Sequence, residues 1–242
     1  MLGAGLLLAA VAGADSSPPG GAEPASGEGW AFKLTPSYYS TTHEKDAADL
    51  NLRANNGPHA WWIGYYQRPR EFEQTRTGYE YTAQFSVVQL VPSMQLASHG
   101  FVGGSLNARV GDTVYALLGL GRTNARDYYN LNFDPNDSVV YGLGTRLLPR
   151  SELSLFTVRD DRLHTGQRVS HLVWRMSPGD GQRWTVDLSS KHGRASPEDE
   201  VVSGRALSVT YDYRDVFVRL ARDRKVNFTM DDQTRASLGF RF

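Results

Sequence analysis

The chain has 242 residues, in which 26 lysines and arginines balance 26 aspartates and glutamates. This length suits one large domain, and the neutral balance lacks the basic footprint of a nucleic-acid-binding protein. The absence of cysteine excludes disulfides, thiolate metal sites and cysteine nucleophiles. Twelve Tyr, ten Phe and five Trp favour strands, and 24 Gly indicate many turns.

The N-terminus has two segments that precede the folded domain. Residues 1–14, MLGAGLLLAAVAGA, resemble a secretory signal peptide, since Ala12-Gly13-Ala14 fits the small-x-small cleavage pattern. No Lys or Arg precedes the apolar stretch, so a short hydrophobic arm is the alternative. Residues 15–28 are rich in proline, glycine and serine, which predicts a disordered leader. We therefore expect the folded domain over residues 29–242.

From Trp30 to Phe242, apolar and polar residues alternate with a period of two and are interrupted by turn residues. Beyond Trp30 no apolar run approaches the roughly 20 residues that a membrane helix needs. The alternation predicts an all-β fold of about 12–14 strands, with 14 favoured. The predicted strands cover residues 30–40, 46–55, 59–68, 77–88, 90–98, 101–110, 113–122, 138–148, 151–160, 167–176, 181–191, 203–213, 215–224 and 234–242.

The connections alternate between short turns and mostly long, polar loops. Counted back from the C-terminus, the short turns lie at 214–215, 178–180, 149–150, 111–112 and 55–58, and the long loops at 225–233, 192–202, 161–166, 123–137 and 69–76. Only the connection at 98–100 is short where a long one is expected. Bacterial outer-membrane barrels have this asymmetry, with the short turns in the periplasm. We therefore predict an antiparallel up-and-down transmembrane barrel, with a soluble β-sandwich as the alternative.

Aromatic residues near the strand ends support a lipid-facing exterior. Trp30, Trp61, Trp174 and Trp184 all lie near predicted periplasmic turns, as in an interfacial girdle. Tyr79 and Tyr81 are expected in the opposite girdle, because the strand 77–88 is predicted to begin at the outer end. A soluble barrel of this size would also enclose a space too wide for side chains to fill.

The last strand, ending in ASLGFRF, places Leu238, Phe240 and Phe242 on one face. This pattern resembles the C-terminal β-signal by which the Bam machinery recognises outer-membrane β-barrels. The resemblance implies a Gram-negative outer membrane and, as partners, periplasmic chaperones, the Bam machinery, and outer-membrane lipid and lipopolysaccharide. Arg222, Arg224 and Lys225, at the outer end of their strand, either meet lipopolysaccharide phosphates or form a solvated charge run.

The opposite face of the strands is charged and should line the lumen. Such charges either set the selectivity of an open channel or pair with one another and close the lumen into a polar core. Because basic residues lead the set, an open lumen should slightly prefer anions. The predicted lumen-lining residues are Arg53, Arg68, Glu80, Arg109, Arg146, His171, Arg175, Asp187, Lys191, Asp212, Arg219 and Arg241.

One candidate active site is the His171–Asp187 pair, because the two residues face each other if the turn at 178–180 is symmetric. A histidine oriented by a carboxylate can act as a general base, with Ser189 or Ser208 as nucleophile, in a lipid-modifying hydrolase. The alternative, which we prefer, is a structural pair without catalysis.

The segment 121–138 is rich in Asn and Asp, which either bind Ca²⁺ or form ordinary turns. Its Tyr128, Tyr129, Leu131 and Phe133 either fold the loop inward as a constriction or pack against the rim. We expect no bound cofactor or metal. The function that we predict is a channel or passive transport route for small polar solutes, and a structural or surface-interaction barrel with an occluded lumen is the alternative.

Overall fold

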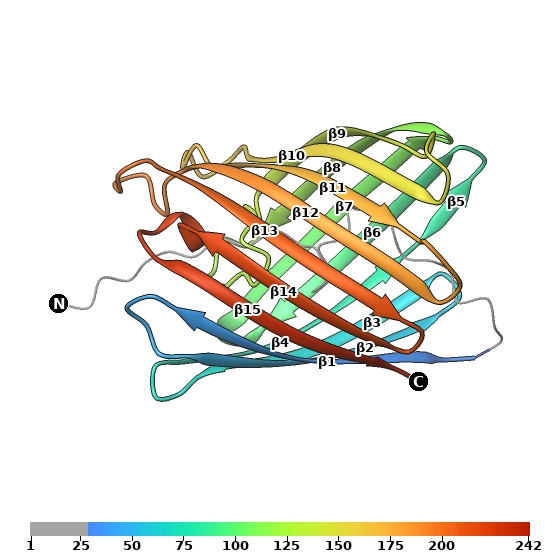
Figure 1. The fold of residues 1–242 in the computed structure, drawn as a ribbon. Coiled ribbons are helices and arrows are strands. Elements are labelled where there is room, and N and C mark those ends of the chain that lie inside the picture. The colour runs from blue at the N-terminus through green and yellow to red at the C-terminus, as the bar shows by residue number, and fades with distance from the viewer. Residues whose placement is uncertain (1–28) are drawn as a thin grey trace.

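The computed structural model describes residues 29–242 as one β-barrel (Figure 1). The predicted signal peptide and leader, residues 1–28, lie outside the described residues. The strands are β1 (Ala31–Thr41), β2 (Ala47–Asn56), β3 (His59–Arg68), β4 (Phe72–Tyr81), β5 (Ala83–Phe85), β6 (Val88–Ala97), β7 (Phe101–Gly111), β8 (Val114–Thr123), β9 (Ser138–Thr145), β10 (Ser151–Asp160), β11 (Arg168–Met176), β12 (Gln182–Gly193), β13 (Val202–Tyr213), β14 (Val216–Arg224) and β15 (Asp232–Arg241).

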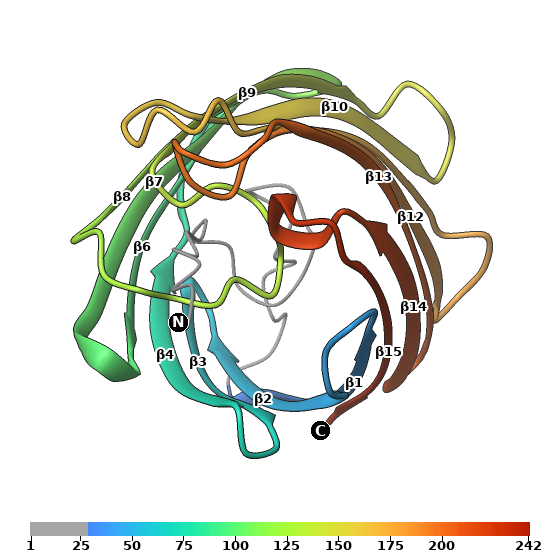
Figure 2. The same ribbon diagram turned by 90° about the vertical axis from the view of Figure 1, so that its left-hand side faces the viewer.

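Each strand pairs antiparallel with its neighbours, and β1 pairs with β15, where Leu34 lies opposite Phe240. The circle closes through β4 and β6, since β5 continues β4 after an interruption at Thr82. The result is the closed 14-strand barrel that the sequence favoured, seen along its axis in Figure 2. Two short 3-10 helices, η1 (Ser98–Gly100) and η2 (Val226–Phe228), lie in the connections. Within residues 29–242, no helix is long and apolar enough to cross a membrane.

The strand β4 begins at Phe72, five residues before the predicted start at 77. The connection from β3 is therefore the short segment 69–71 rather than a long loop. The new residues of the strand are polar on both faces, with Glu73 and Thr75 outside and Gln74 and Arg76 inside, so that no apolar alternation marked them.

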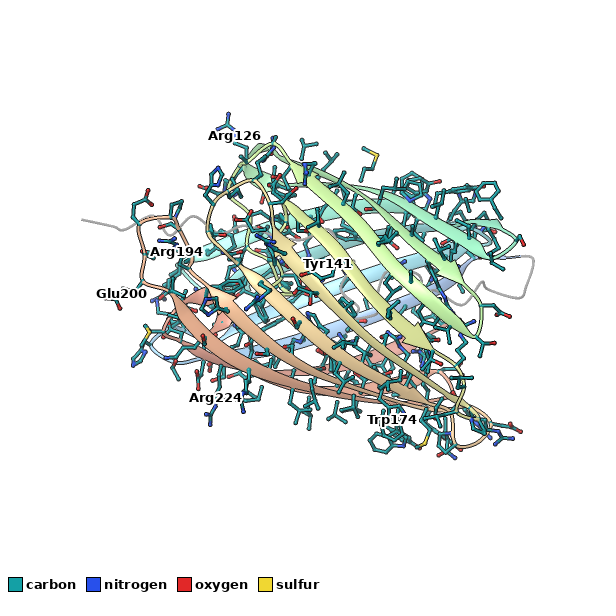
Figure 3. All side chains as sticks on the ribbon, turned by 90° about the horizontal axis from the view of Figure 1, so that it is seen from above. Arg126, Tyr141, Trp174, Arg194, Glu200 and Arg224 are labelled. Atoms are coloured by element: carbon teal, nitrogen blue, oxygen red, sulfur yellow. The ribbon has the colours of Figure 1, made fainter. Side chains whose placement is uncertain are left out.

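The same change overturns the prediction for Tyr79 and Tyr81. Both lie at the end of β4 that leads into the short turn, and the Tyr79 ring packs 4.4 Å from that of Trp61. They therefore lie with Trp61 at the end of the barrel that carries the short turns, and not at the opposite end. Trp30 stacks on Phe32 and Phe32 on Phe242, with centroids 6.5 and 5.7 Å apart, and Trp174 lies at the same end of the barrel (Figure 3).

The outer face of the barrel is an apolar belt. Leu155, Leu172, Leu188 and Leu207 are neighbours on β10–β13, and each exposes between 41% and 59% of its surface. A closed strand ring leaves no unpaired edge, and a continuous apolar exterior is stable only against lipid. On β8, which is apolar on both faces, Leu118 and Leu120 face outward while Tyr115 and Leu117 are buried inside.

Candidate functional site in the barrel lumen

The inner face of the strands carries the residues expected to line the lumen. They come from strands all around the barrel, so their effect depends on the height at which each one lies. We call the half of the lumen near the short turns the turn-side half and the other the loop-side half. Arg53, Glu80, Arg109, Arg146, Arg175, Asp212, Arg219 and Arg241 lie in the turn-side half, and Arg68, His171, Asp187 and Lys191 in the loop-side half.

The turn-side half has an excess of positive charge. The carboxylates on the inner face of its strands are Glu80, Glu152 and Asp212, and Asp112 in the β7–β8 turn also attracts Arg109. The eight cationic side chains that share this half are Lys33, Arg53, Arg109, Arg146, Arg175, Arg183, Arg219 and Arg241.

Three arginines of this half surround the single carboxylate of Glu152. Arg146 Nε and Arg175 Nη1 lie 3.1 and 3.6 Å from the Glu152 oxygens, and the Tyr115 hydroxyl donates to the same group at 2.6 Å. The Arg109 guanidinium lies 3.7 Å from the centroid of the Tyr115 ring. Its buried Nη2 has no hydrogen-bond partner among the described residues. One wall of the turn-side half thus presents a guanidinium cluster with only partial charge compensation.

Glycines let the aromatic side chains of this half lie flat against the wall. Tyr115 faces Gly144 across the β8–β9 pair, and a Cβ at Gly144 would collide with the tyrosine ring. Phe217 covers Gly239 in the same way, and Lys33 Nζ lies 5.7 Å from the Phe217 centroid. The glycine-rich inner face therefore keeps the rings out of the centre of the turn-side half.

The other two carboxylates lie elsewhere on the circumference, Glu80 on β4 and Asp212 on β13. Glu80 forms an ion pair with Arg53 at 2.6 Å. Asp212 forms ion pairs with Arg241 and with Arg183, the latter at 3.5 Å. Each of these carboxylates neutralises one charge, so the excess of positive charge extends around the circumference.

The loop-side half is filled by the connection between β8 and β9, residues 124–137, which crosses the lumen (Figure 2). Tyr128, Tyr129 and Leu131 of this 124–137 loop are buried. Tyr128 stacks on Phe101 with centroids 4.3 Å apart. The loop thus lies inside the barrel, as a constriction, and does not pack on the rim.

Tyr129 is the main attachment of the loop to the far wall. Its backbone N–H donates to Gln74 Oε1 at 2.8 Å, and its carbonyl accepts from Gln74 Nε2 at 3.0 Å. Its ring stacks on Tyr66 at 4.8 Å, and its hydroxyl accepts from Gln233 Nε2 at 3.3 Å. Burial raises the pKa of the Tyr129 phenol, so the hydroxyl stays neutral.

A second loop enters the lumen beside the first. Val226, Asn227 and Phe228 of η2 are buried, and Figure 2 shows this segment, which follows β14, pointing inward. Lys191 connects the two loops, because its Nζ lies 5.7 Å from the ring centroid of Phe133 and 5.8 Å from that of Phe228.

Most charges of the loop-side half are in close ion pairs, and Arg235 instead donates to the Leu131 carbonyl at 3.4 Å. Lys191 Nζ lies 2.6 Å from Asp223, Arg76 lies 2.8 Å from Asp49, and Arg68 lies 2.5 Å from Glu44. Lys191 and Arg76 expose only 1% and 3% of their side chains. This half therefore resembles a polar protein core, held by ion pairs away from water.

His171 lies between two carboxylates. Its Nδ1 is 3.1 Å from both Asp187 oxygens, and its Nε2 is 3.1 Å from Asp134 of the 124–137 loop. The register differs from the symmetric turn, since the turn spans 177–181 and pairs His171 with Ser189, so that Asp187 is a diagonal neighbour. Both ring nitrogens are occupied, which leaves none to accept a proton from a serine.

The oxygen ligands of the 124–137 loop stabilise the loop itself. Asn130 donates to the Asp134 carbonyl at 2.6 Å, and Asp137 accepts from Thr123 Oγ1 at 2.6 Å and from Arg162 at 2.8 Å. In residues 29–242, no three His, Asp or Glu side chains converge as a metal site. The wall partners Tyr66, Gln74 and Gln233 were missed, since no short motif connects them to the loop.

Comparisons with known proteins extend the description of the fold. No protein-family model matches the chain, and no curated protein matches it either. The outer membrane protein Omp33 of Acinetobacter baumannii superposes with a TM-score of 0.58 at 9% identity, over 89% of this chain and 100% of that one. A variant of the Rh. blastica porin has a TM-score of 0.50 at 10% identity, over 88% of this chain and 100% of the porin. At such identities the likeness concerns the fold, and the chain is a closed β-barrel with the fold of Gram-negative outer-membrane porins.

Proposed function

We propose that the protein is a passive channel for small anionic solutes, narrowed at its loop side by the 124–137 loop. The observation that carries the proposal is the charge of the turn-side half, where eight cationic side chains meet the three carboxylates of the inner strand face. A sealed polar core would need charge balance, because an uncompensated charge out of water is costly. A wall with more cations than carboxylates suits an aqueous lumen that holds anions.

The two halves then have separate roles. The turn-side guanidiniums concentrate anions, as a charged cleft of one sign does. The 124–137 loop sets the size limit, since its contacts with the wall are all non-covalent and it can move with Tyr129 and His171 as its attachment points. A neutral or cationic solute gains nothing from the turn-side wall.

The test is single-channel conductance in a planar bilayer, with reversal potentials in a salt gradient. The wild-type barrel should conduct with anion selectivity, and replacing residues 126–135 by three Gly/Ser residues should raise the conductance several-fold. The matched control shortens residues 195–200, which lie in a connection on the same side of the barrel. Arg109→Glu should lower the anion selectivity, whereas Arg222→Glu on the outer face should not.

An occluded structural barrel is the second candidate, supported by the paired core of the loop-side half. It predicts that the wild type never conducts while the loop-shortened variant does. That result, or a cation-selective wild-type channel, would overturn the proposal. The hydrolase alternative loses its support from His171, whose nitrogens are both engaged.

A further inference from the structure

The exterior of the barrel carries a second basic feature, separate from the lumen. Above the leucine neighbours of β10–β13, toward the loops, the outward residues become Thr157, Ser170, Ser190 and Arg205. Two residues further on, Arg159 lies opposite Arg168, and Arg168 opposite His192. Because a strand advances about 7 Å in two residues, Arg205 lies about 7 Å and Arg159 and Arg168 about 14 Å from the leucines, measured along the tilted strands.

On the adjacent pair of strands, Arg205 and Arg224 lie one step beyond the Ala206–Asp223 pair and also point outward. Figure 3 shows Arg224 projecting away from the barrel wall near the loop end. We name Arg159, Arg168, Arg205 and Arg224 the arginine row. All four are exposed and lie in the loop-side parts of neighbouring strands.

The arginine row has no anionic partner in the part of the chain that the structure describes. Other outward arginines at the same end do have one, since Arg122 forms two hydrogen bonds with Asp161 at 2.6 and 2.9 Å, and Arg222 reaches Asp232 at 3.1 Å. Like charges directly opposite each other destabilise a sheet. The Arg159–Arg168 pair therefore costs stability unless an anion lies between them.

The rest of the circumference has a different chemistry at this height. On β1–β4 the outward polar groups are tyrosines bonded to carboxylates, Tyr38 with Asp46 and, at 2.9 Å, Tyr65 with Glu73. Among the outward arginines of the described strands, those without an anionic partner lie in the sector β10–β14, whereas Arg122 on β8 and Arg222 on β14 have one. A surface potential needed only for solubility would not favour one sector of the barrel.

We infer that the arginine row binds the phosphate groups of a phosphorylated glycolipid in the outer leaflet, with lipid A as the defining chemistry. The acyl chains would lie on the leucines of the apolar belt, and the phosphates would lie between opposed guanidiniums, which bind phosphate oxygens in a bidentate way. The occupant follows from charge complementarity and from the height of the row at the membrane surface.

The test compares the full barrel with the quadruple variant R159Q/R168Q/R205Q/R224Q in phosphatidylcholine vesicles, with and without bisphosphorylated lipid A. Each basic residue near an anionic lipid surface is worth about fivefold in affinity. The variant should therefore lose more than about a hundredfold in lipid A affinity. The matched control R122Q/R222Q removes two arginines that have protein partners, and should lose far less.

Melting temperatures with and without lipid A give a second readout, in addition to the binding affinity. Without lipid A the quadruple variant should melt at a higher temperature than the wild type, because the arginine repulsion is gone. With lipid A the order should reverse. Equal lipid A affinity in both proteins would overturn the inference, as would equal stabilisation of the wild type by dephosphorylated lipid A. Stabilisation by phosphatidylglycerol or by inorganic phosphate to the same extent would assign the row to general anionic lipid or to free anions instead.

Discussion

The two halves of the lumen are built by the same strands but solve the problem of buried charge in opposite ways. In the loop-side half, Lys191, Arg76 and Arg68 each lie within 2.8 Å of a carboxylate, and two loops fill the space between the walls. In the turn-side half, Glu152 lies among three arginines, Arg109, Arg146 and Arg175. The difference teaches that the alternation of a strand fixes which side chains point inward, while the loops decide whether those side chains meet water.

The largest expected effect is the loss of the buried ion pair of the loop-side half. Lys191→Met leaves Asp223 buried without its partner, and breaking a buried pair costs about 3–5 kcal/mol. The same change at Arg183, whose side chain is 36% exposed, should cost at most about 1 kcal/mol. Denaturant unfolding midpoints of the two variants in lipid vesicles measure the contrast. Equal losses of stability in the two variants would contradict a difference in solvation between the two halves of the lumen.

Removal of the Tyr129 side chain should come next. Tyr129→Ala deletes the ring that stacks on Tyr66 and the hydroxyl that accepts from Gln233, and truncating a buried aromatic costs about 3–5 kcal/mol when the structure cannot relax. A loop relaxes better than a core, so we expect about 2–3 kcal/mol together with a higher conductance. Tyr141→Ala on the outer face is the control, and an unchanged conductance in Tyr129→Ala would contradict the role of this attachment.

A moderate effect is expected at Gly144, against which the Tyr115 ring packs in the turn-side half. Gly144→Ala places a methyl group in the space of the Tyr115 ring, and such overpacking costs about 1–3 kcal/mol. The displaced ring should also enter the lumen and lower the conductance. Gly104→Ala is the control, because its nearest neighbour is the Ser93 carbonyl oxygen at an ordinary 3.4 Å. Equal thermal stability of the two variants would contradict the close packing of Tyr115 on the wall.

The smallest effect concerns Glu44, in the connection between β1 and β2. Burial outweighs the attraction of Arg68 and raises the pKa of Glu44 above the ordinary value of 4.5. The folded barrel therefore favours the protonated form, and the contribution of this group to stability falls as the pH rises through its folded pKa. Glu44→Gln should change stability by less than about 0.5 kcal/mol. The stability of this variant relative to the wild type should increase as the pH rises. Melting curves from pH about 4 to 8 measure this, and a gain on acidification would reverse the assigned sign.

The sequence predicted the barrel because its signal is local. Alternation between apolar and polar residues marked almost every strand, and the strand count of 14 is confirmed. The start of β4 was missed because Glu73, Gln74, Thr75 and Arg76 are polar on both faces. The partition of β8 was ambiguous because Tyr115 and Leu117 are apolar residues of the inner wall, where Gly119 and Gly121 leave room beside them.

The site was less predictable, because it depends on distance across the lumen. A charge on the inner face can be assigned from the period of the strand, but its partner lies several strands away. Gln74 and Tyr129 are 55 residues apart and exchange two hydrogen bonds, and no pattern in the sequence joins them. The diagonal contact of His171 with Asp187 depends on a turn of five residues, 177–181, where the sequence predicted the three residues 178–180 and a directly facing pair.

The inward position of the 124–137 loop also constrains how the barrel is assembled. Tyr129 binds Gln233 on β15, and in the same cluster Tyr66 packs against Tyr39 on β1, so the loop braces both sides of the β1–β15 seam from within. The seam joins the first strand to the last, and both must be synthesised before it forms. The 124–137 loop and its cluster thus hold the first and last strands together from within the lumen, which opposes lateral opening of the seam.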